Sequence, residues 1–215
     1  MISKRIFDLL SCSIALLLLF PFMLLISMAI VLNSRGGVFY RQMRVGKNNR
    51  DFHLYKFRTM RTGSDKQRLI TVGNRDERIT TVGYFLRKTK LDELPQLVNI
   101  LKGDMSIVGP RPEVRKYVDL YSEEQRRVLS VLPGLTDYAS IAYINENALL
   151  EQSDNPEQTY INEIMPAKLQ LNFKYIENQS FFVDLKIIFK TIGGIFLPPP
   201  TPSERGGFPS TLERG

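Results

Sequence analysis

The carboxylates of Asp92 and Glu93 are neighbours in the chain, and Arg111 follows between Pro110 and Pro112. Adjacent carboxylates repel, so both ionise readily only when a cation or hydrogen bonds compensate them. A hard divalent ion such as Mg²⁺ compensates them and also bridges a diphosphate. The two prolines restrict the backbone around Arg111, whose planar guanidinium suits phosphate oxygens. Since a carboxylate can attack phosphorus to give an acyl phosphate, these residues indicate phosphoryl chemistry.

Each of these signals also has an ordinary structural explanation. An Asp three positions before Pro95 is usually a helix cap, and a Pro-Arg-Pro segment is commonly a rigid loop with a solvated charge. The basic residues from Arg41 to Arg61 would ordinarily form a solvated face or contact lipid headgroups. His53 and Cys12 are each the only residue of their type, so zinc sites and Cys/His nucleophilic pairs lack partners.

Composition and charge are those of one catalytic unit with an anionic partner. The 215 residues, 43% of them hydrophobic, can bury one core together with a membrane segment. The formal charge of +7 fits phosphate ligands, an anionic lipid surface or nucleic acid without choosing among them. We expect no nucleic-acid partner, because no recognition motif accompanies the charge.

The segment Ile14 to Leu32 carries no charged residue and is just long enough for a helix through a hydrocarbon core of roughly 30 Å. Pro21 lies inside it, lacks an amide hydrogen and should kink the helix. Lys4 and Arg5 precede the segment, and further basic residues follow it, namely Arg35, Arg41, Arg44, Lys47 and Arg50. Because basic flanks prefer the cytoplasmic side, both ends are expected there, which favours a re-entrant helix bent at Pro21.

Two simpler explanations of the apolar segment remain open. One is a straight signal anchor, which would carry one basic flank across the membrane. The other is a cleaved signal peptide, with Ser27, Met28 and Ala29 as a small-x-small site. The apolar residues continue past that site through Ile30 to Leu32, which argues against cleavage.

The rest of the chain predicts an α+β fold that is mostly helical. Val38 to Arg41 and Phe52 to Phe57 should form a hairpin around the turn-prone Gly46 to Asn49. Apolar positions recur at helical spacing from Ile79 to Leu101, with Gly103 as a stop, so that Asp92 and Glu93 lie at the entrance of a second helix. Further helices are expected over Val114 to Leu132 and Lys168 to Ile176.

The last helix, Ser180 to Phe196, has apolar residues along one side and Asp184, Lys186 and Lys190 elsewhere. That pattern suits core packing and a bilayer interface equally. The predicted organisation is therefore a membrane helix in 1–35, a catalytic domain in 36–197 with interfacial helices, and a disordered tail in 198–215.

Several ordered blocks of sequence resemble the monotopic phosphoglycosyl transferases, the bacterial sugar transferases that act on undecaprenyl phosphate. The resemblance covers Lys4 to Ile192 and is carried by Lys4-Arg5-Ile6-Phe7-Asp8, Val38-Phe39-Tyr40-Arg41-Gln42, Lys56-Phe57-Arg58-Thr59-Met60, Asp92-Glu93-Leu94-Pro95-Gln96, Val108-Gly109-Pro110-Arg111-Pro112 and Pro133-Gly134-Leu135-Thr136. It implies a re-entrant membrane helix, an Asp92-Glu93 dyad, Mg²⁺ and a ping-pong mechanism. The segment Asp137 to Ile141 departs from the family's usual Gly-Trp-Ala-Gln, which bears on the identity of the donor.

On this basis we expect an enzyme at the cytoplasmic face of a bacterial inner membrane that transfers a sugar 1-phosphate from a UDP-sugar to polyprenyl phosphate. Asp92 would be the nucleophile, with Mg²⁺ on Glu93 and Asp92 and phosphate contacts from Arg111, Lys56 and Arg58. Lys4, Arg5 and Asp8 would support the membrane helix, with Asp8 as an ion-pair partner. A homo-oligomer is possible, and the rival functions are an ordinary glycosyl transferase and a non-enzymatic membrane adaptor that binds acidic partners.

Overall fold

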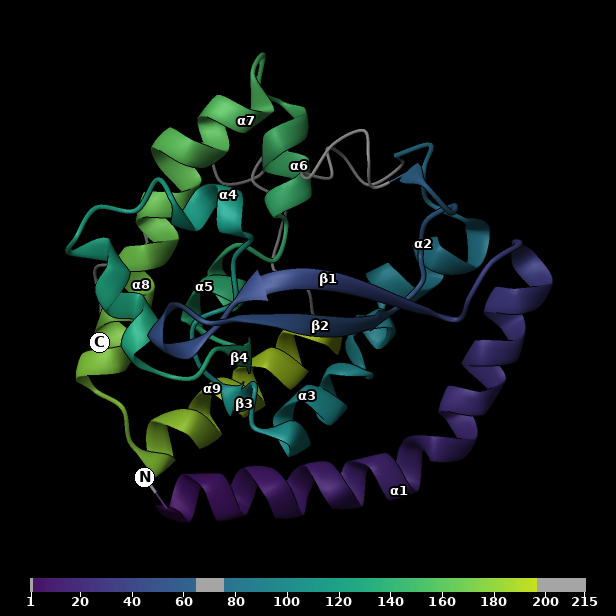
Figure 1. The fold of residues 1–215 in the computed structure, drawn as a ribbon, viewed down its shortest axis with the longest axis horizontal. Coiled ribbons are helices and arrows are strands. Elements are labelled where there is room, and N and C mark those ends of the chain that lie inside the picture. The colour runs from purple at the N-terminus through teal and green to yellow at the C-terminus, as the bar shows by residue number, and fades with distance from the viewer. Residues whose placement is uncertain (1, 65–75, 197–215) are drawn as a thin grey trace.

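The computed structural model describes residues 2–64 and 76–196, so the predicted tail lies outside the described part. The fold is mostly helical, with a long apolar helix at its N-terminus and a short antiparallel hairpin (Figure 1). The helices are α1 (Ile2–Asn33), α2 (Thr81–Lys88), α3 (Gln96–Lys102), α4 (Arg115–Val118), α5 (Tyr138–Ala142), α6 (Glu146–Glu151), α7 (Pro156–Thr159), α8 (Met165–Glu177) and α9 (Phe181–Phe196). Short helical segments are η1 (Lys47–Asn49), η3 (Leu91–Glu93), η4 (Gln125–Ser130) and η5 (Tyr160–Ile164).

The predicted hairpin is confirmed as β1 (Phe39–Val45) and β2 (Asp51–Phe57). The strands pair antiparallel from Phe39 opposite Phe57 to Val45 opposite Asp51. Asn48 and Asn49 take positive φ values of 56° and 61° in the turn, a conformation that asparagine tolerates better than most residues. β2 thereby carries Lys56 to the end of the hairpin that lies next to the acidic pair.

The two helices predicted around the acidic pair are α2 and α3, with η3 between them. Thr80 caps α2 by accepting a hydrogen bond from the Gly83 amide at 3.0 Å. α3 ends at Gly103, whose φ of 93° fits the predicted stop. The Asn99 side chain docks α3 on β2, since it donates to His53 O at 2.7 Å and accepts from the Tyr55 amide at 3.0 Å.

The single helix predicted over Val114 to Leu132 is wrong, because the chain forms α4 and then η4 with a turn between them. The Ser122 hydroxyl accepts from the Gln125 amide, and the Gln125 side chain accepts from the Ser122 amide. This reciprocal pair has the pattern of a capping box, and η4 begins directly after it at Gln125. The Ser-x-x-Gln spacing was therefore the signal in the sequence that marks the break.

Two three-residue strands, β3 (Ser106–Val108) and β4 (Gly134–Thr136), pair in parallel and were not predicted. Their pairing brings Gly109 and Gly134 together so closely that a Cβ on Gly134 would lie 2.1 Å from Gly109 N. Only glycine fits at this approach. The short strand pair fixes the position from which Pro110 and Arg111 depart.

Helix α1 contains Pro21 and is continuous from Ile2 to Asn33, and it runs as two arms that meet at a marked bend (Figure 1). It contacts the rest of the protein toward both of its ends. Cys12 packs in a core cluster with Ile100 and Met105, whereas Ile30 packs in another with Phe57 and Leu86. Only 6% of the most apolar stretch of α1 is buried inside the protein. Among the described residues, α1 is the one helix long and apolar enough to cross a membrane.

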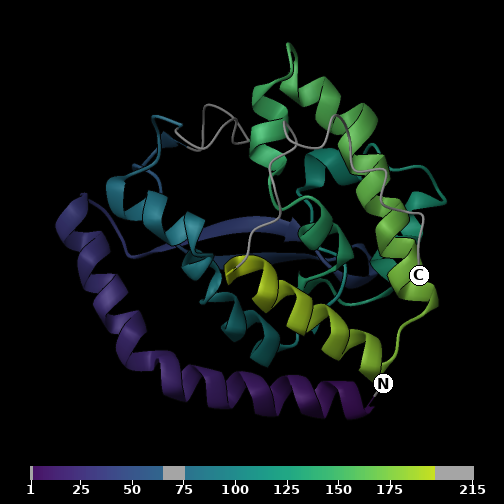
Figure 2. The same cartoon turned by 180° about the vertical axis from the view of Figure 1, so that it is seen from behind.

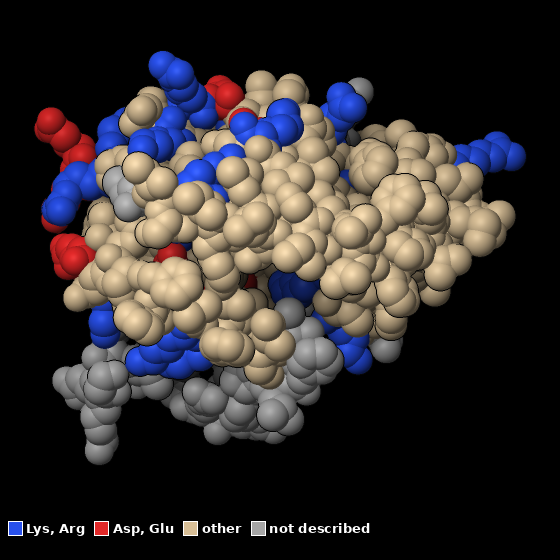
Figure 3. Space-filling model, turned by 90° about the horizontal axis from the view of Figure 1, so that it is seen from below, with Lys and Arg blue, Asp and Glu red and all other residues tan. Residues whose placement is uncertain are grey.

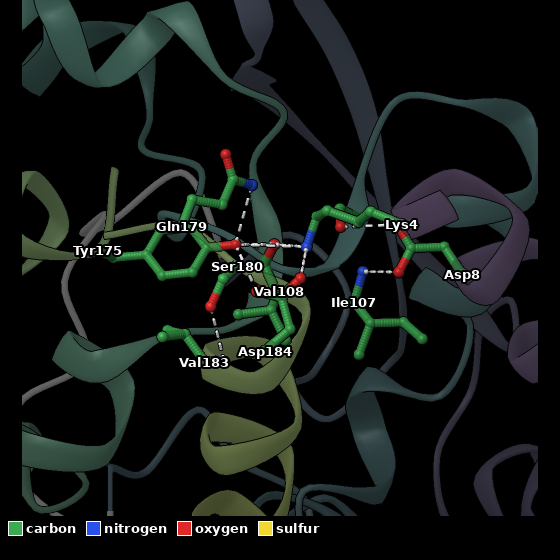
Figure 4. A network of polar contacts seen from close by, with 10 residues as sticks. Lys4, Asp8, Ile107, Val108, Tyr175, Gln179, Ser180, Val183 and Asp184 are labelled. Atoms are coloured by element: carbon green, nitrogen blue, oxygen red, sulfur yellow. Dashed lines mark hydrogen bonds and ion pairs between the residues drawn. The ribbon is translucent and has the colours of Figure 1, made fainter. Parts of the chain in front are cut away.

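The N-terminal residues of α1 are tied to the protein individually, and the predicted ion pair of Asp8 with Lys4 or Arg5 is wrong. Lys4 Nζ instead lies 2.5 Å from Asp184 Oδ2 and also donates to Val108 O (Figure 4). Arg5 donates to the carbonyls of Ile100 and Leu101, at the end of α3. The Asp8 carboxylate accepts from Ser106 Oγ at 2.7 Å and from the Ile107 amide.

Helix α9 combines the two alternatives left open by its sequence. Ile187 is fully buried and Asp184 is 3% exposed, so the predicted placement of Asp184 away from the packed side is wrong. The cause is the ion pair with Lys4 and a hydrogen bond that Tyr175 Oη donates to Asp184 Oδ1 at 2.7 Å. Phe182 and Phe189 are 81% and 69% exposed.

Exposed apolar side chains gather on one face of the molecule. Figure 3 shows this face as largely uncharged, with Lys and Arg side chains near its edges. Helix α1 runs along this face (Figure 1). Helix α9 lies near α1 when the molecule is viewed from behind (Figure 2). The exposed large apolar residues of these two helices include Leu17, Leu18, Phe20, Phe22, Leu24, Leu25, Leu32, Phe182 and Phe189. A patch of this kind marks a surface that meets lipid or another apolar partner.

Candidate active site

Asp92 and Glu93 lie on η3, in the short connection between α2 and α3. Lys90, just before this turn, has a left-handed backbone with φ 58°, a strained conformation for a residue with a side chain. Asp92 is 5% exposed, and within the described ranges its carboxylate accepts no hydrogen bond. The acidic pair is therefore held on a constrained turn, with the Asp92 carboxylate left available for another reactant.

Glu93 is held between two cations that come from distant parts of the chain. Lys56 Nζ lies 3.1 Å from Glu93 Oε1. Arg111 Nη1 lies 3.2 Å from Oε2, and Arg111 Nη2 donates to Oε1, which makes the arginine contact bidentate. The compensation that adjacent carboxylates require is thus supplied, for Glu93, by side chains of the protein itself.

The two carboxyl groups are consequently driven in opposite directions. Burial raises the pKa of Asp92, the charge of Lys56 opposes that shift, and the neighbouring Glu93 adds to it. Burial would also raise the pKa of Glu93, but the charges of Arg111 and Lys56 outweigh it and hold that pKa well below the usual value. Glu93 therefore stays ionised, whereas Asp92 loses its proton only at a higher pH than an ordinary aspartate.

Lys56 and Arg111 respond to the same site differently. Burial lowers the pKa of Lys56, and Glu93 opposes this shift. The charge of Glu93 raises the pKa of Arg111, which stays protonated throughout. Both cations stand beside the acidic pair, as predicted for residues that would contact phosphate.

Arg58 was predicted to join them, but the structure gives its side chain other partners. Its guanidinium donates to Gly37 O at 2.5 Å, to Ser34 Oγ at 2.7 Å and to Ser34 O at 2.9 Å. These groups follow the end of α1, so Arg58 anchors the connection between the apolar helix and the hairpin. The prediction of a phosphate contact from Arg58 is not supported by this placement.

The site includes Arg87, which the sequence did not single out, and Asp137, which lies in the segment expected to bear on the donor. Arg87, in the last turn of α2, lies near enough to Asp92 for the two charges to act on each other's pKa. Asp137 is fully buried, and its carboxylate accepts hydrogen bonds from the backbone amides of Arg111 and Ser140. Asp137 therefore holds the backbone at Arg111 through the Arg111 amide. A basic residue five positions before the acidic pair was the available signal for Arg87.

The fit of the site to Mg²⁺ follows from its donors. Over the residues that the structure covers, no three His, Cys, Asp or Glu side chains cluster as a metal site. Mg²⁺ commonly binds through one or two carboxylates together with substrate phosphates, and Asp92 and Glu93 can supply that share. Since Glu93 already contacts Lys56 and Arg111, an ion would compete with these two cations for its oxygens.

Comparison with known proteins gives one family and several relatives. The model of the family described as bacterial sugar transferase matches residues 1–198. The chain is 40% identical to the UDP-N-acetylgalactosamine-undecaprenyl-phosphate N-acetylgalactosaminephosphotransferase of Aeromonas hydrophila, over 88% of this chain and 42% of that protein. It is 37% identical to the UDP-glucose:undecaprenyl-phosphate glucose-1-phosphate transferase of Klebsiella pneumoniae, over 89% of this chain and 40% of that one.

A third relative has a similar length. The chain is 41% identical to the uncharacterized sugar transferase EpsL of Bacillus subtilis, over 89% of this chain and 86% of that protein. The chain thus spans less than half of the two relatives whose names give a reaction, and most of one whose name gives none.

Proposed function

This chain belongs to the bacterial sugar transferase family, and we propose that it transfers a sugar 1-phosphate from a UDP-sugar to polyprenyl phosphate, with release of UMP. The names of the Aeromonas and Klebsiella relatives give reactions of this kind on undecaprenyl phosphate. The product would be a polyprenyl diphosphate sugar, the starting lipid for a bacterial glycoconjugate.

The observation that carries the proposal is the contrast between the two adjacent carboxylates. Glu93 is engaged by Arg111 and Lys56, whereas Asp92 carries no hydrogen bond within the described residues. A nucleophile must have an oxygen free to reach phosphorus, and only Asp92 of the pair meets that requirement. Lys56 and Arg111 stand beside it as cations for the phosphate oxygens.

In the proposed first step, an Asp92 oxygen attacks the phosphorus that bears the sugar. The new bond joins this oxygen to phosphorus, and the bond to the bridging oxygen breaks, so that UMP leaves with the electron pair. In the second step, an oxygen of polyprenyl phosphate attacks the same phosphorus and forms a diphosphate. The bond to Asp92 breaks and returns the carboxylate, so both steps balance without an added proton donor.

The membrane side of the proposal rests on how α1 is attached. A helix of 32 residues is about 48 Å long, enough to cross a bilayer if straight. Yet Cys12 and Ile30, toward opposite ends of α1, both pack on the catalytic domain. A re-entrant helix on the cytoplasmic face of the inner membrane keeps both ends on one side. The exposed Phe182 and Phe189 of α9 would then lie in the same interface.

Mg²⁺ is the cofactor we propose, held by Asp92 and Glu93. When bound, it would neutralise part of the charge of the donor diphosphate. The protein's own share in the chemistry is to hold the Arg111 and Lys56 cations beside Asp92, with Glu93 fixing both.

The decisive experiment incubates the purified protein with Mg²⁺ and UDP-sugars labelled in the sugar, without a lipid acceptor. Wild type should retain the label and release UMP, whereas Asp92→Asn should retain none. Addition of polyprenyl phosphate should then discharge the label into lipid. Release of UDP would identify an ordinary glycosyl transferase instead. An adaptor without enzymatic activity would retain no label and would bind acidic partners more weakly as salt rises.

A further inference from the structure

A cavity of about 160 Å³ opens beside Arg111, on the side of the molecule that carries α4, α6 and α8. α8 contributes one helical face to its wall, consisting of Met165, Lys168, Leu169 and Asn172. Arg111 borders the cavity and also contacts Glu93, so the cavity adjoins the proposed phosphate site.

The charged groups of this cavity are already paired within the protein. Glu113 lies 3.2 Å from Arg44 and accepts a hydrogen bond from Tyr160 Oη. Lys168 Nζ lies 2.7 Å from Glu146 Oε2. A second phosphate would therefore find few uncommitted cations here, and the cavity suits an uncharged group instead.

Asn172 is the exception to this internal pairing. It is 6% exposed, it lines the cavity, and its Oδ1 is buried without a hydrogen-bond partner. Leaving a buried polar atom without a hydrogen-bond partner is unfavourable, so such an atom marks a place where a ligand can bind. The side-chain amide offers one acceptor and a donor group side by side, which complements an N–H next to a C=O.

We infer that the cavity binds the uracil nucleoside of the donor and that Asn172 recognises the base. This inference rests on the proposed function, because in-line attack by Asp92 places the leaving nucleotide on the far side of the phosphorus. Asn172 would accept from the imide N–H of uracil and donate to the adjacent carbonyl. The cavity is also lined by Tyr117 and Tyr160, with ring centroids 5.0 Å apart, and by Tyr121, and aromatic side chains of this kind can pack against a flat base.

The test measures binding of UMP and of 3-methyl-UMP, which lacks the imide hydrogen, to the full chain in detergent by calorimetry. Wild type should bind UMP about tenfold or more tightly than 3-methyl-UMP, the factor expected for one good hydrogen bond. Asn172→Leu, close in size, should bind both as weakly as wild type binds 3-methyl-UMP. Asn162→Leu, at an exposed asparagine outside the cavity, should behave as wild type.

Two results would overturn the inference. One is equal affinity of wild type for UMP and 3-methyl-UMP, a comparison that does not depend on how well a variant folds. The other is an Asn172→Leu variant that keeps its UMP affinity and loses affinity for glucose 1-phosphate or N-acetylgalactosamine 1-phosphate, which would place the sugar in the cavity. UMP binding requires no turnover, so its dependence on Asn172 can be measured whether or not Asp92 retains label. Absence of label on Asp92 would contradict the proposed function and would leave the inference about Asn172 intact.

Discussion

Arg111 makes a bidentate contact with the Glu93 carboxylate, through Nη1 to Oε2 and Nη2 to Oε1. Lys56 Nζ lies 3.1 Å from Oε1 of the same carboxylate. Glu93 therefore fixes two cations next to Asp92 while remaining ionised itself. Its partners come from β2 and from the loop after β3, so one carboxylate joins three separate segments. This arrangement assigns different tasks to two residues that are neighbours in sequence.

The fork geometry should make Arg111 sensitive even to a conservative change. Arg111→Lys keeps the charge but cannot make the bidentate contact with Glu93 or with phosphate. We expect the initial rate of sugar-phosphate labelling to fall by about tenfold or more. Arg126→Lys, at an exposed position on η4, is the matched control and should label at the wild-type rate. Equal rates for the two variants would show that the fork is dispensable.

The charge state of Asp92 should set the acidic limb of the reaction. A protonated carboxyl group is not a nucleophile, and burial raises the pKa of Asp92 above its ordinary value of 3.8. Labelling should therefore increase with pH, with a midpoint above 3.8. Because the charge of Lys56 lowers the pKa of Asp92, Lys56→Met should move this midpoint to higher pH.

Rapid-quench labelling across a pH series would measure both midpoints. The fall in rate caused by losing a phosphate contact affects every pH equally, so the midpoint separates the two roles of Lys56. A midpoint that stays unchanged or moves to lower pH in Lys56→Met would contradict this account of Asp92.

The close approach of β3 and β4 should be essential to the position of Arg111. A Cβ on Gly134 would lie within 2.4 Å of both Gly109 N and Gly109 O, so Gly134→Ala must push the loop that carries Arg111. We expect a loss of thermal stability and a loss of labelling. Gly193→Ala has open space around its Cβ and lies within α9, where alanine favours helix, so it should remain as stable as wild type. Similar melting temperatures for the two variants would argue against a tight contact.

Chelation should separate the chemistry of the site from its stability. The protein cations Arg111 and Lys56 already compensate Glu93, so EDTA should leave the melting temperature unchanged. Labelling of Asp92 should nevertheless be lost and should return on addition of Mg²⁺, because the donor diphosphate also needs neutralisation. Undiminished labelling in EDTA would remove Mg²⁺ from the proposal.

Features that depend on local spacing could be predicted from the sequence. The hairpin followed from two β-prone segments around a turn, and α3 followed from helical periodicity that ends at Gly103. The prediction of one helix over Val114 to Leu132 was wrong because the apolar periodicity continues across the Ser122–Gln125 pair that interrupts the helix. The three-residue strands β3 and β4 are too short to leave a periodic pattern.

The amino-acid sequence by itself determined that Asp92 and Glu93 are adjacent, that Arg111 lies between prolines and that an apolar helix precedes them, since these are properties of neighbouring residues. Only the tertiary structure decided that Glu93 pairs with Lys56 and Arg111, that Lys4 pairs with a buried Asp184, and that Arg58 anchors the end of α1. These partners are far apart in the chain, and their meeting depends on which helix and strand faces pack together. Packing of that kind is set by the whole core and leaves no trace in local spacing.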